Sequence, residues 1–394
     1  MVVAIARVVI SGAGLAGLRT VEELRARGYD GEITLIGAEP RPPYDRPPLS
    51  KQLMAGEVDD TTLRDDLDSL GADVRLGETA AGLGDRVLRT DRGDYGFDSL
   101  VLATGSLPVA LPGPGRQRFL RTLDDALALR ALLRPGLRLV IVGAGWIGAE
   151  LATAAAARGC LVTVVEAARA PLAAAVSAEV GALTERWYAG AGVSLRLGQP
   201  ASSVQPGGLA LADGGWLEAD EIVTAVGVRP AVGWLASSDV HVDGGITVDE
   251  FLRTSVPGVF AVGDCAAFWS ARYGRRLRFE HWDVALRAPE VVAANLLGGA
   301  AAYDPVPYFW SEQFGRMVQY AGYHGGADQL VLRGDPAGAR WAACWLAGDR
   351  LVAAFCVNSP PDLLQARRFI QDGAAVEAGR LADPALPVRA AARS

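Results

Sequence analysis

The chain has 394 residues, of which 50% are hydrophobic and 21% charged, and its net charge at pH 7 is −7. This length predicts two or three domains, and the composition is typical of a globular protein with large cores. No apolar run reaches the ~18 residues that a membrane span needs, and the net negative charge argues against general nucleic-acid binding. Met1–Ala6 has no cationic segment ahead of its apolar residues, so we expect no signal peptide and a cytoplasmic protein.

A strand over Arg7–Ser11 is the first predicted element, and a helix over Leu15–Arg27 follows it and ends at Gly28. Between them the glycines allow a tight turn, close backbone approach to a pyrophosphate, and close packing of helix on strand. This loop reads Gly12-Ala13-Gly14-Leu15-Ala16-Gly17. It predicts a site where the phosphates of a dinucleotide lie at the helix N-terminus.

The next strand, Glu32–Gly37, is followed by an acidic residue, Glu39. An acid at this place accepts hydrogen bonds from a ribose, and Glu39 has close to the required spacing of about 20 residues from the loop. Farther along, Leu100–Gly105 passes from a strand into a loop. Its small residues, Thr104 and Gly105 among them, allow the chain to lie close to the cofactor.

A second strand, loop and helix repeat this scheme. The strand is Leu139–Val142 and the helix Ile147–Arg158, and the loop between them reads Gly143-Ala144-Gly145-Trp146-Ile147-Gly148. The following strand ends in Glu166, whose carboxylate binds a free ribose 2′-hydroxyl and repels a 2′-phosphate. Arg169 lies close by and is a weaker indication of NADPH.

Two such loops indicate two dinucleotides, the arrangement needed to pass a hydride from a nicotinamide to a flavin. The alternative is one working loop and one structural copy. The second unit closes with Ile222–Pro230, where we place Gly227 among the nucleotide-binding residues. A buried strand ending at Asp264 then returns to the first domain. We expect a helix from Ala266, with Asp264 near its N-terminus as a ligand of a ribityl hydroxyl or as a helix cap.

Cysteine and histidine usage excludes two neighbouring chemistries. No two cysteines stand close enough for a Cys-x-x-Cys motif, so we expect four buried thiols rather than a redox-active dithiol, although distant cysteines can meet in a fold. Electrons would then leave a flavin directly for an external acceptor. The histidines are scattered, so no metal site is expected. These residues are Cys160, Cys265, Cys344, Cys356, His241, His281 and His324.

Lys51 is the only lysine among 38 lysine and arginine residues, and it follows a proline-rich turn over Pro43–Ser50. Arginine cannot lose its proton in a protein, and its fork is bulkier than an ammonium group. A site that needs a small point charge beside a flavin ring would therefore tolerate lysine only. The alternative is an ordinary surface lysine.

The composition changes near Trp310, where short alternating runs begin. Runs over Arg340–Trp345 and Arg350–Val357 predict an antiparallel sheet in a small third domain. The predicted fold class is α/β, with two Rossmann-like dinucleotide-binding domains, the first interrupted by the second, and a small α+β C-terminal domain.

Over about residues 7 to 373, the chain resembles the flavoprotein ferredoxin reductases of the putidaredoxin reductase and biphenyl dioxygenase reductase type. Together and in order the shared motifs are specific, whereas singly only the motif ending in Lys51 is. The motifs are both glycine loops, Pro43-Tyr44-x-Arg46-Pro47-x-Leu49-Ser50-Lys51, Ala103-Thr104-Gly105, Leu120-Arg121-Thr122, Gly263-Asp264-Cys265, Glu280-x-Trp282 and Phe309-Trp310-Ser311-Glu312-Gln313.

The resemblance implies FAD in a first domain (1–110 and 238–309), NADH in an inserted second domain (111–237), and a third domain (310–394) that closes over the flavin and helps to form the partner surface. It places Lys51 near the flavin N5 edge, with Glu150 able to pair with it.

The resemblance also implies roles for individual residues. Trp282 is placed at the isoalloxazine end, Asp264 on the ribityl chain, and Arg121 at the FAD phosphates or adenosine side. Lys51, Glu150 and Trp282 are thus the catalytic candidates. The remaining cofactor-binding candidates are Gly12, Gly14, Ala16, Gly17, Glu39, Arg46, Ala81, Thr104, Gly105, Gly143, Gly145, Ile147, Gly148, Glu166 and Gly227.

Two departures from the family pattern stand out. The family usually has a glutamine shortly after the Glu-x-Trp motif, where this chain has Arg287-Ala288-Pro289. We expect this change to remove a polar group near the flavin and to alter the start of a helix. Many relatives also have an acid directly after the glycine that ends the second strand, where this chain has Ala38. Glu39 would then substitute for it.

These features together predict an FAD-dependent NADH reductase that passes electrons singly to a ferredoxin-type iron–sulfur partner of an oxygenase, as a monomer or homodimer. One alternative is an NADH reductase of a small-molecule acceptor in a biosynthetic pathway. Another is a flavoprotein whose NADH-bound state governs protein interaction, as in the resemblance to apoptosis-inducing factor.

An acidic ferredoxin would be repelled by the net charge of −7, so a local basic patch must steer it. The candidate patch consists of Arg272, Arg275, Arg276 and Arg278, extended by Arg64, Arg287 and Arg316. The alternative is an ordinary solvated loop.

Overall fold

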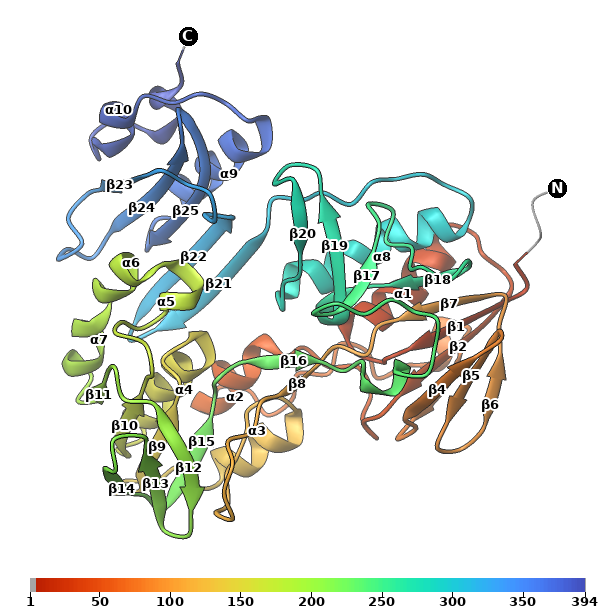
Figure 1. The fold of residues 1–394 in the computed structure, drawn as a ribbon, viewed down its shortest axis with the longest axis horizontal. Helices are drawn as coiled ribbons and strands as arrows, with labels where there is room; N and C mark the ends of the chain where they lie inside the picture. The colour runs from red at the N-terminus through yellow and green to blue at the C-terminus, as the bar shows by residue number, and fades with distance from the viewer. Residues whose placement is uncertain (1–4, 394) are drawn as a thin grey trace. The chain divides into compact units, whose positions relative to one another are not determined.

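The computed structural model describes residues 5–393 and divides the chain into two compact units (Figure 1). The first unit contains the residues up to Asp45, Thr61–Leu107 and Arg229–Pro305, and the second contains Arg46–Asp60, Pro108–Val228 and the residues from Val306 onward. The expectation of no signal peptide rests mainly on Met1–Ala4, and these residues lie outside the described ones. Within residues 5–393, no helix has both the length and the apolar character to span a membrane.

A five-stranded parallel sheet forms the centre of the first unit, in the order β18-β7-β1-β2-β3. Its strands are β1 (Arg7–Ser11), β2 (Glu32–Gly37), β3 (Asp73–Leu76), β7 (Ser99–Leu102) and β18 (Val259–Ala261). The order changes direction between β1 and β7, and ligands of such sheets bind at the carboxyl ends of the strands at this point. The first glycine loop follows β1 there.

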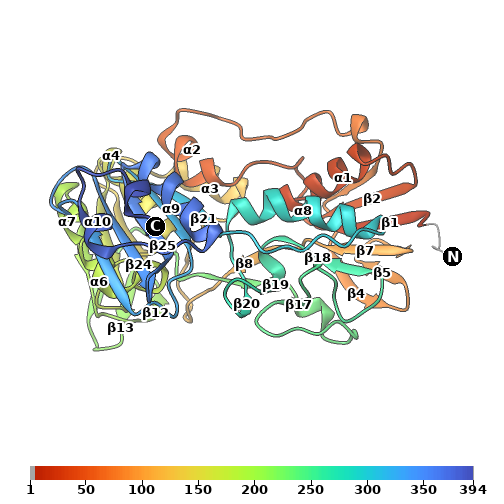
Figure 2. The same ribbon diagram turned by 90° about the horizontal axis from the view of Figure 1, so that it is seen from above.

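Two helices of the first unit, α1 (Leu15–Ala26) and α8 (Trp282–Leu296), pack against each other, as Figure 2 shows. We expected the Arg287-Ala288-Pro289 sequence to alter a helix start, and this is wrong. Helix α8 begins at Trp282 and continues through Pro289. Proline costs an interior hydrogen bond, but Pro289 is buried in a long helix whose packing against α1 outweighs that loss.

Two smaller sheets complete the first unit. One is antiparallel and contains β4 (Ala80–Gly84), β5 (Val87–Thr90) and β6 (Asp94–Gly96). The other contains β17 (Ile246–Val248), β19 (Ala266–Ser270) and β20 (Arg275–Leu277). The helix expected from Ala266 is therefore wrong. An alanine-rich start favours a helix locally, but pairing of β19 with strands on both sides decides the outcome.

The second unit contains a four-stranded parallel sheet in the order β11-β10-β9-β15. These strands are β9 (Arg138–Val142), β10 (Leu161–Val165), β11 (Ser194–Arg196) and β15 (Glu221–Thr224), and helix α4 (Trp146–Ala157) follows β9. Around them lie α2 (Gln52–Ala55), α3 (Leu123–Arg130), α5 (Ala173–Val176), α6 (Ala178–Ala182), α7 (Glu185–Gly190), β12 (Ala201–Gln205), β13 (Gly208–Leu211) and β14 (Trp216–Glu218). Strands β8 (Ser106–Pro108) and β16 (Val228–Pro230) carry the chain between the units.

A five-stranded antiparallel sheet, in the order β21-β22-β25-β24-β23, confirms the predicted C-terminal sheet. Its strands are β21 (Tyr308–Gln313), β22 (Arg316–Gly322), β23 (Gln329–Arg333), β24 (Trp341–Ala347) and β25 (Arg350–Val357), followed by α9 (Pro360–Asp372) and α10 (Ala378–Ala382). One face packs on α9 and α10. The other packs on residues of α5, α6 and α7, including Trp187, so both faces are apolar and β24 is buried nearly throughout.

Candidate functional site

The two glycine loops have the same backbone geometry. Gly12 and Gly143 have φ values of +120° and +109°, which L-residues rarely adopt. A Cβ at Gly12 would stand 2.0 Å from the Ala103 carbonyl oxygen, and one at Gly143 would stand 2.3 Å from that of Ala225. Both positions therefore exclude a side chain, because the next parallel strand of each sheet passes directly behind the turn.

The middle glycine of each loop differs from the first, because a Cβ at Gly14 or Gly145 would meet no protein atom within 4 Å. These glycines are the N-caps of α1 and α4, and neither helix receives a side-chain cap. The free backbone N–H groups in the first turn of a helix without a side-chain cap favour the binding of an anion. The open space in front of both glycines therefore fits the pyrophosphates of the two expected dinucleotides, FAD and NADH.

The acid of the second loop is held against the loop itself. Glu166 accepts hydrogen bonds from the backbone N–H groups of Ala144, at 2.7 Å, and Ala168, at 2.8 Å. The carboxylate is thus fixed one residue away from the glycine turn, where a ribose hydroxyl would approach it. The acid of the first loop, Glu39, instead accepts from the Tyr44 hydroxyl at 2.6 Å.

Lys51 and Glu150 form a buried ion pair within the second unit, with Nζ 2.9 Å from Oε1 and side-chain exposures of 8% and 1%. The alternative of a surface lysine is therefore wrong. Ser50 Oγ donates to Glu150 Oε2, and Ser311 Oγ donates to Oε1 at 2.6 Å. Helix α4 begins at Trp146, so Glu150 lies in its second turn.

Two candidates of the first unit are fixed by polar contacts. Trp282 begins α8, and its indole N–H donates to Asp45 Oδ1 at 2.7 Å. Asp264 lies in a short 3-10 turn, Gly263–Cys265, and its carboxylate accepts from the Ser106 hydroxyl at 2.8 Å. Asp264 is followed by strand β19, so the alternative that it caps an α-helix is also wrong.

The remaining candidates lie on loops and element ends. Thr104 donates to the Ala231 carbonyl at 2.9 Å, and Arg46 donates to the carbonyl of Arg121. Ile147 is 40% exposed on α4, although it is a large hydrophobic residue. Ala16 is buried at the start of α1, Ala81 is exposed on β4, and Gly105 and Gly227 have left-handed backbones.

Several arginines of the predicted basic patch are engaged in structural contacts. Arg276 donates to the carbonyls of Val248 and Ala267, and Arg287 pairs with Asp283 at 2.7 Å. Arg278 pairs with Glu280, and Arg316 lies over the Trp187 ring.

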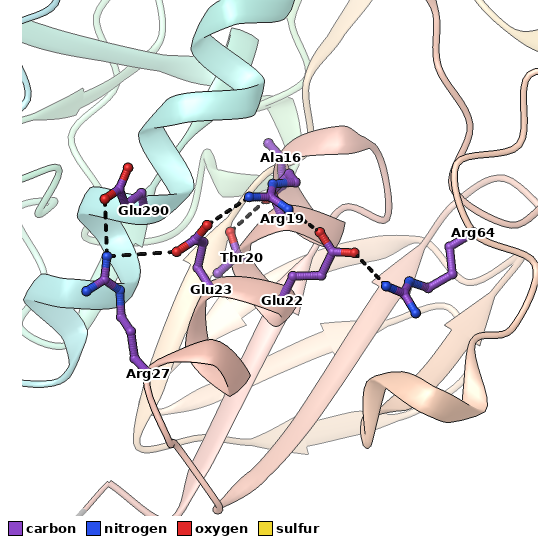
Figure 3. Close-up of polar contacts among 8 residues, drawn as sticks. All are labelled: Ala16, Arg19, Thr20, Glu22, Glu23, Arg27, Arg64 and Glu290. Atoms are coloured by element: carbon purple, nitrogen blue, oxygen red, sulfur yellow. Dashed lines mark hydrogen bonds and ion pairs between the residues drawn. The ribbon is translucent and has the colours of Figure 1, made fainter.

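Arg64 of the predicted patch belongs to a chain of alternating charges along α1. Arg64 Nη2 lies 3.1 Å from Glu22 Oε1. Figure 3 shows how Arg19, Glu23, Arg27 and Glu290 continue the chain toward α8. This pairing cancels the positive charge of Arg64 locally. Arg275 is exposed on β20 and is therefore the position at which we test the patch.

All four cysteines are buried and free, which confirms the expected thiols. Burial raises the pKa of Cys265 and raises that of Cys344 to about 12. A thiol in such surroundings is a poor nucleophile at neutral pH, since the thiolate is the reactive species.

Three polar residues of this site were not singled out from the sequence: Asp45, Ser50 and Ser311. Each lies within one of the sequence motifs on which the family resemblance rests. Only the buried alternation of β21, which puts Ser311 among inward-facing positions, gives a physical signal for one of them.

Comparison with known proteins gives consistent matches along the chain. Residues 6–288 match the family described as pyridine nucleotide-disulphide oxidoreductase, and residues 308–392 match the reductase C-terminal family. The chain is 38% identical to the ferredoxin–NAD(+) reductase component of the anthranilate 1,2-dioxygenase system of Burkholderia cepacia, over 97% of this chain and 98% of that protein.

Solved structures agree with these matches. The structure of Fdr9 has a TM-score of 0.94 and 48% identity, over 97% of this chain and 99% of that one. The covalent complex of putidaredoxin reductase with putidaredoxin has a TM-score of 0.93 and 32% identity, over 98% of this chain and 97% of that one.

Proposed function

Because this chain belongs to the pyridine nucleotide-disulphide oxidoreductase family, we propose that it takes hydride from NADH and passes electrons singly to a ferredoxin-type iron–sulfur protein that serves an oxygenase. The observations that carry the proposal are the pair of matching glycine loops, one in each unit, and the buried lysine–carboxylate pair of the second unit.

Membership of the family confirms the predicted resemblance, the α/β fold class, and an oxidoreductase that uses FAD and NAD(H). The flavin, when bound, accepts a hydride as two electrons and releases electrons one at a time. Among the described residues, the cysteines are free and buried, so the chain relies on the flavin rather than on a disulphide.

The chain's own contribution is to bind, orient and supply charge. In this proposal the first loop holds FAD, with Glu39 and Arg46 at its adenosine half, Asp264 on its ribityl chain, and Trp282 at its ring end. The second loop holds NADH, and Glu166 selects it over NADPH because a 2′-phosphate would meet a fixed carboxylate.

Lys51 supplies a compact positive charge beside the flavin N5 edge, where negative charge develops during reduction. Burial of an isolated ammonium would be costly, and Glu150 offsets this by pairing with it. The ion pair has no net charge but is strongly polar. Its orientation therefore decides how strongly the electric field of the Lys51 ammonium acts on the flavin ring.

The partner assignment is supported by the relatives. The similar protein of Burkholderia cepacia is named as a reductase component of a dioxygenase system, and the structurally similar reductase was solved in complex with putidaredoxin. We propose that this chain acts on an acidic ferredoxin through the β19–β20 hairpin, in the cytoplasm, as a monomer or homodimer.

Anaerobic stopped-flow spectroscopy tests the proposal. NADH should bleach the flavin with about two electrons per FAD, and an oxidised [2Fe–2S] ferredoxin should then reoxidise it fast enough to support cytochrome c reduction. Uptake of four electrons with a thiolate-to-flavin band would contradict the flavin-only route. Fast reoxidation by a quinone but not by any ferredoxin would favour the small-molecule acceptor instead.

A further inference from the structure

Strand β21 and helix α4 are joined by three successive contacts within the second unit. The tilted rings of Trp146 and Phe309 have centroids 4.7 Å apart, Ser311 donates to Glu150, and the amide of Phe314, the residue directly after β21, donates to Thr153 Oγ1 at 3.0 Å. The three α4 residues are spaced four and three apart, so they lie on one face of the helix. Glu150 is therefore the middle contact between the nucleotide-binding helix and the C-terminal sheet.

The hydrogen bonds around Glu150 have a fixed direction. A carboxylate ion only accepts, so the single proton of Ser311 is committed to Glu150 Oε1. The lone pairs of the same hydroxyl are left to accept from Gln313 Nε2, which lies 3.0 Å away. Gln313, Ser311, Glu150 and Lys51 thus form one oriented chain that begins on β21 and ends at the ammonium group.

Burial makes this chain energetically significant. Ser311 is 0% and Gln313 1% exposed, and both occupy inward-facing positions of β21 that would suit apolar residues. A polar side chain at such a position is costly unless its hydrogen bonds are made. Hydrogen bonds to a charged group are shorter and stronger than neutral ones, and the 2.6 Å contact between Ser311 and Glu150 is of this kind.

Both members of the ion pair make further polar contacts, and Lys51 Nζ also donates to the Pro47 carbonyl at 3.3 Å. Glu150 Oε1 receives both Lys51 Nζ and Ser311 Oγ, whereas Oε2 receives Ser50, which comes from the same turn as Lys51. Ser50 and Lys51 are adjacent, so the bond from Ser50 joins the carboxylate to the segment that carries the lysine. Ser311 joins the same carboxylate to the five-stranded C-terminal sheet.

We propose that Ser311 is a positioning residue for hydride transfer: its hydroxyl, oriented by Gln313, fixes the Glu150 carboxylate and through it the Lys51 ammonium. The C-terminal sheet thereby sets the orientation of the charge beside the flavin. This inference rests on the proposed function, because it assigns Lys51 to the flavin edge.

The decisive variant is Ser311→Ala, measured against Thr153→Val. Both remove a hydroxyl from the contacts between β21 and α4, but only Ser311 touches the Glu150 carboxylate. We expect Ser311→Ala to slow flavin reduction at saturating NADH by about 5- to 10-fold, the rate equivalent of part of one charge-assisted hydrogen bond. The Kd for NADH should stay within about twofold, and Thr153→Val should reduce at the wild-type rate.

A double-mutant cycle then shows whether Ser311 acts through the carboxylate. In a Glu150→Gln background, Ser311→Ala should slow reduction by less than about twofold further, since the charge that it positions is already gone. Ser311→Thr, which keeps the hydroxyl, should restore most of the rate, and Gln313→Leu should show a smaller loss than Ser311→Ala.

Urea unfolding of the FAD-bound proteins gives a readout that is independent of catalysis. Ser311→Ala should lower the unfolding midpoint in the wild-type background and lower it less beside Glu150→Gln. Equal rate losses in Ser311→Ala and Thr153→Val would reduce Ser311 to a packing residue, and a wild-type rate in Ser311→Ala would reject the inference. If the wild-type protein did not oxidise NADH, this result would contradict the proposed function itself and not only the role of Ser311.

Discussion

The two glycine loops have nearly the same turn but hold their acids differently. Gly12 and Gly143 share a left-handed backbone and a carbonyl oxygen close behind. Glu166 is tied to its own loop through the Ala144 amide, whereas Glu39 is tied to Tyr44, which lies farther along the chain. The turn geometry is therefore shared by the two loops, whereas the way in which each acid is held differs between them.

The largest effect should come from adding a methyl group to either turn. Gly12→Ala forces a Cβ against backbone that cannot move away, so we expect protein without FAD. Gly143→Ala should remain yellow but lose affinity for NADH by about 100-fold or more. The ratio of absorbance at 450 and 280 nm and a stopped-flow NADH titration measure the two outcomes.

The matched controls are Gly14→Ala and Gly145→Ala, whose Cβ atoms would meet no protein atom within 4 Å. Both should fold normally, and each should weaken only the nucleotide of its own loop. If Gly14→Ala bound FAD as tightly as the wild type, the pyrophosphate would not lie against that glycine.

The next largest effect concerns the choice of nucleotide. Glu166→Gln keeps one acceptor for the loop amides and removes the charge. We expect the ratio of kcat/KM for NADPH to that for NADH to rise by about tenfold, the equivalent of ~1.4 kcal/mol. Glu39→Gln is the internal comparison and should leave this ratio unchanged. An unchanged ratio in Glu166→Gln would transfer the selectivity to another residue such as Arg169.

A smaller effect is expected at the partner surface of the first unit. Arg275→Glu should raise the KM for ferredoxin by about threefold and flatten its salt dependence, because an exposed charge mainly changes the association rate. The same charge change at exposed Arg196, on β11 of the second unit, is the control. Ferricyanide reduction by NADH should be unaffected in both. Equal ferredoxin kinetics in the two variants would exclude the β19–β20 hairpin.

An effect of similar, small size should follow loss of the Glu39 charge. Glu39→Gln should weaken FAD binding by about threefold, since one hydrogen bond to a ribose is replaced by a neutral one. Tyr44→Phe, which removes the hydroxyl that holds Glu39, should give a comparable loss. Equilibrium dialysis of the FAD-free protein measures both. Wild-type affinity in the two variants would show that Glu39 does not replace the usual acid.

The features predicted from sequence were those set by local rules. A glycine that must have positive φ, or an acid at the end of a parallel strand, follows from neighbours in the chain. The strand at Ala266 was mistaken for a helix because its pairing partners come from distant segments. The contacts that engage Arg64 and Arg276 could not be predicted from sequence either, since Glu22 and Val248 lie far from them along the chain.

Ser311 illustrates the same limit at the site. The motif that contains Ser311 indicated the family. No sequence pattern around β21, however, indicates that the Ser311 hydroxyl donates a hydrogen bond to a glutamate on another element. Contacts between side chains of different elements depend on how those elements pack, which periodicity alone does not specify.

The burial of the four cysteines has a practical consequence. Cys265 belongs to the first unit, and Cys160, Cys344 and Cys356 belong to the second. Thiol reagents can reach these sulfur atoms only when the surrounding structure opens, so alkylation rates report local unfolding. Mass spectrometry of the alkylated peptides would therefore follow the opening of each unit separately, without any engineered label and without the flavin signal.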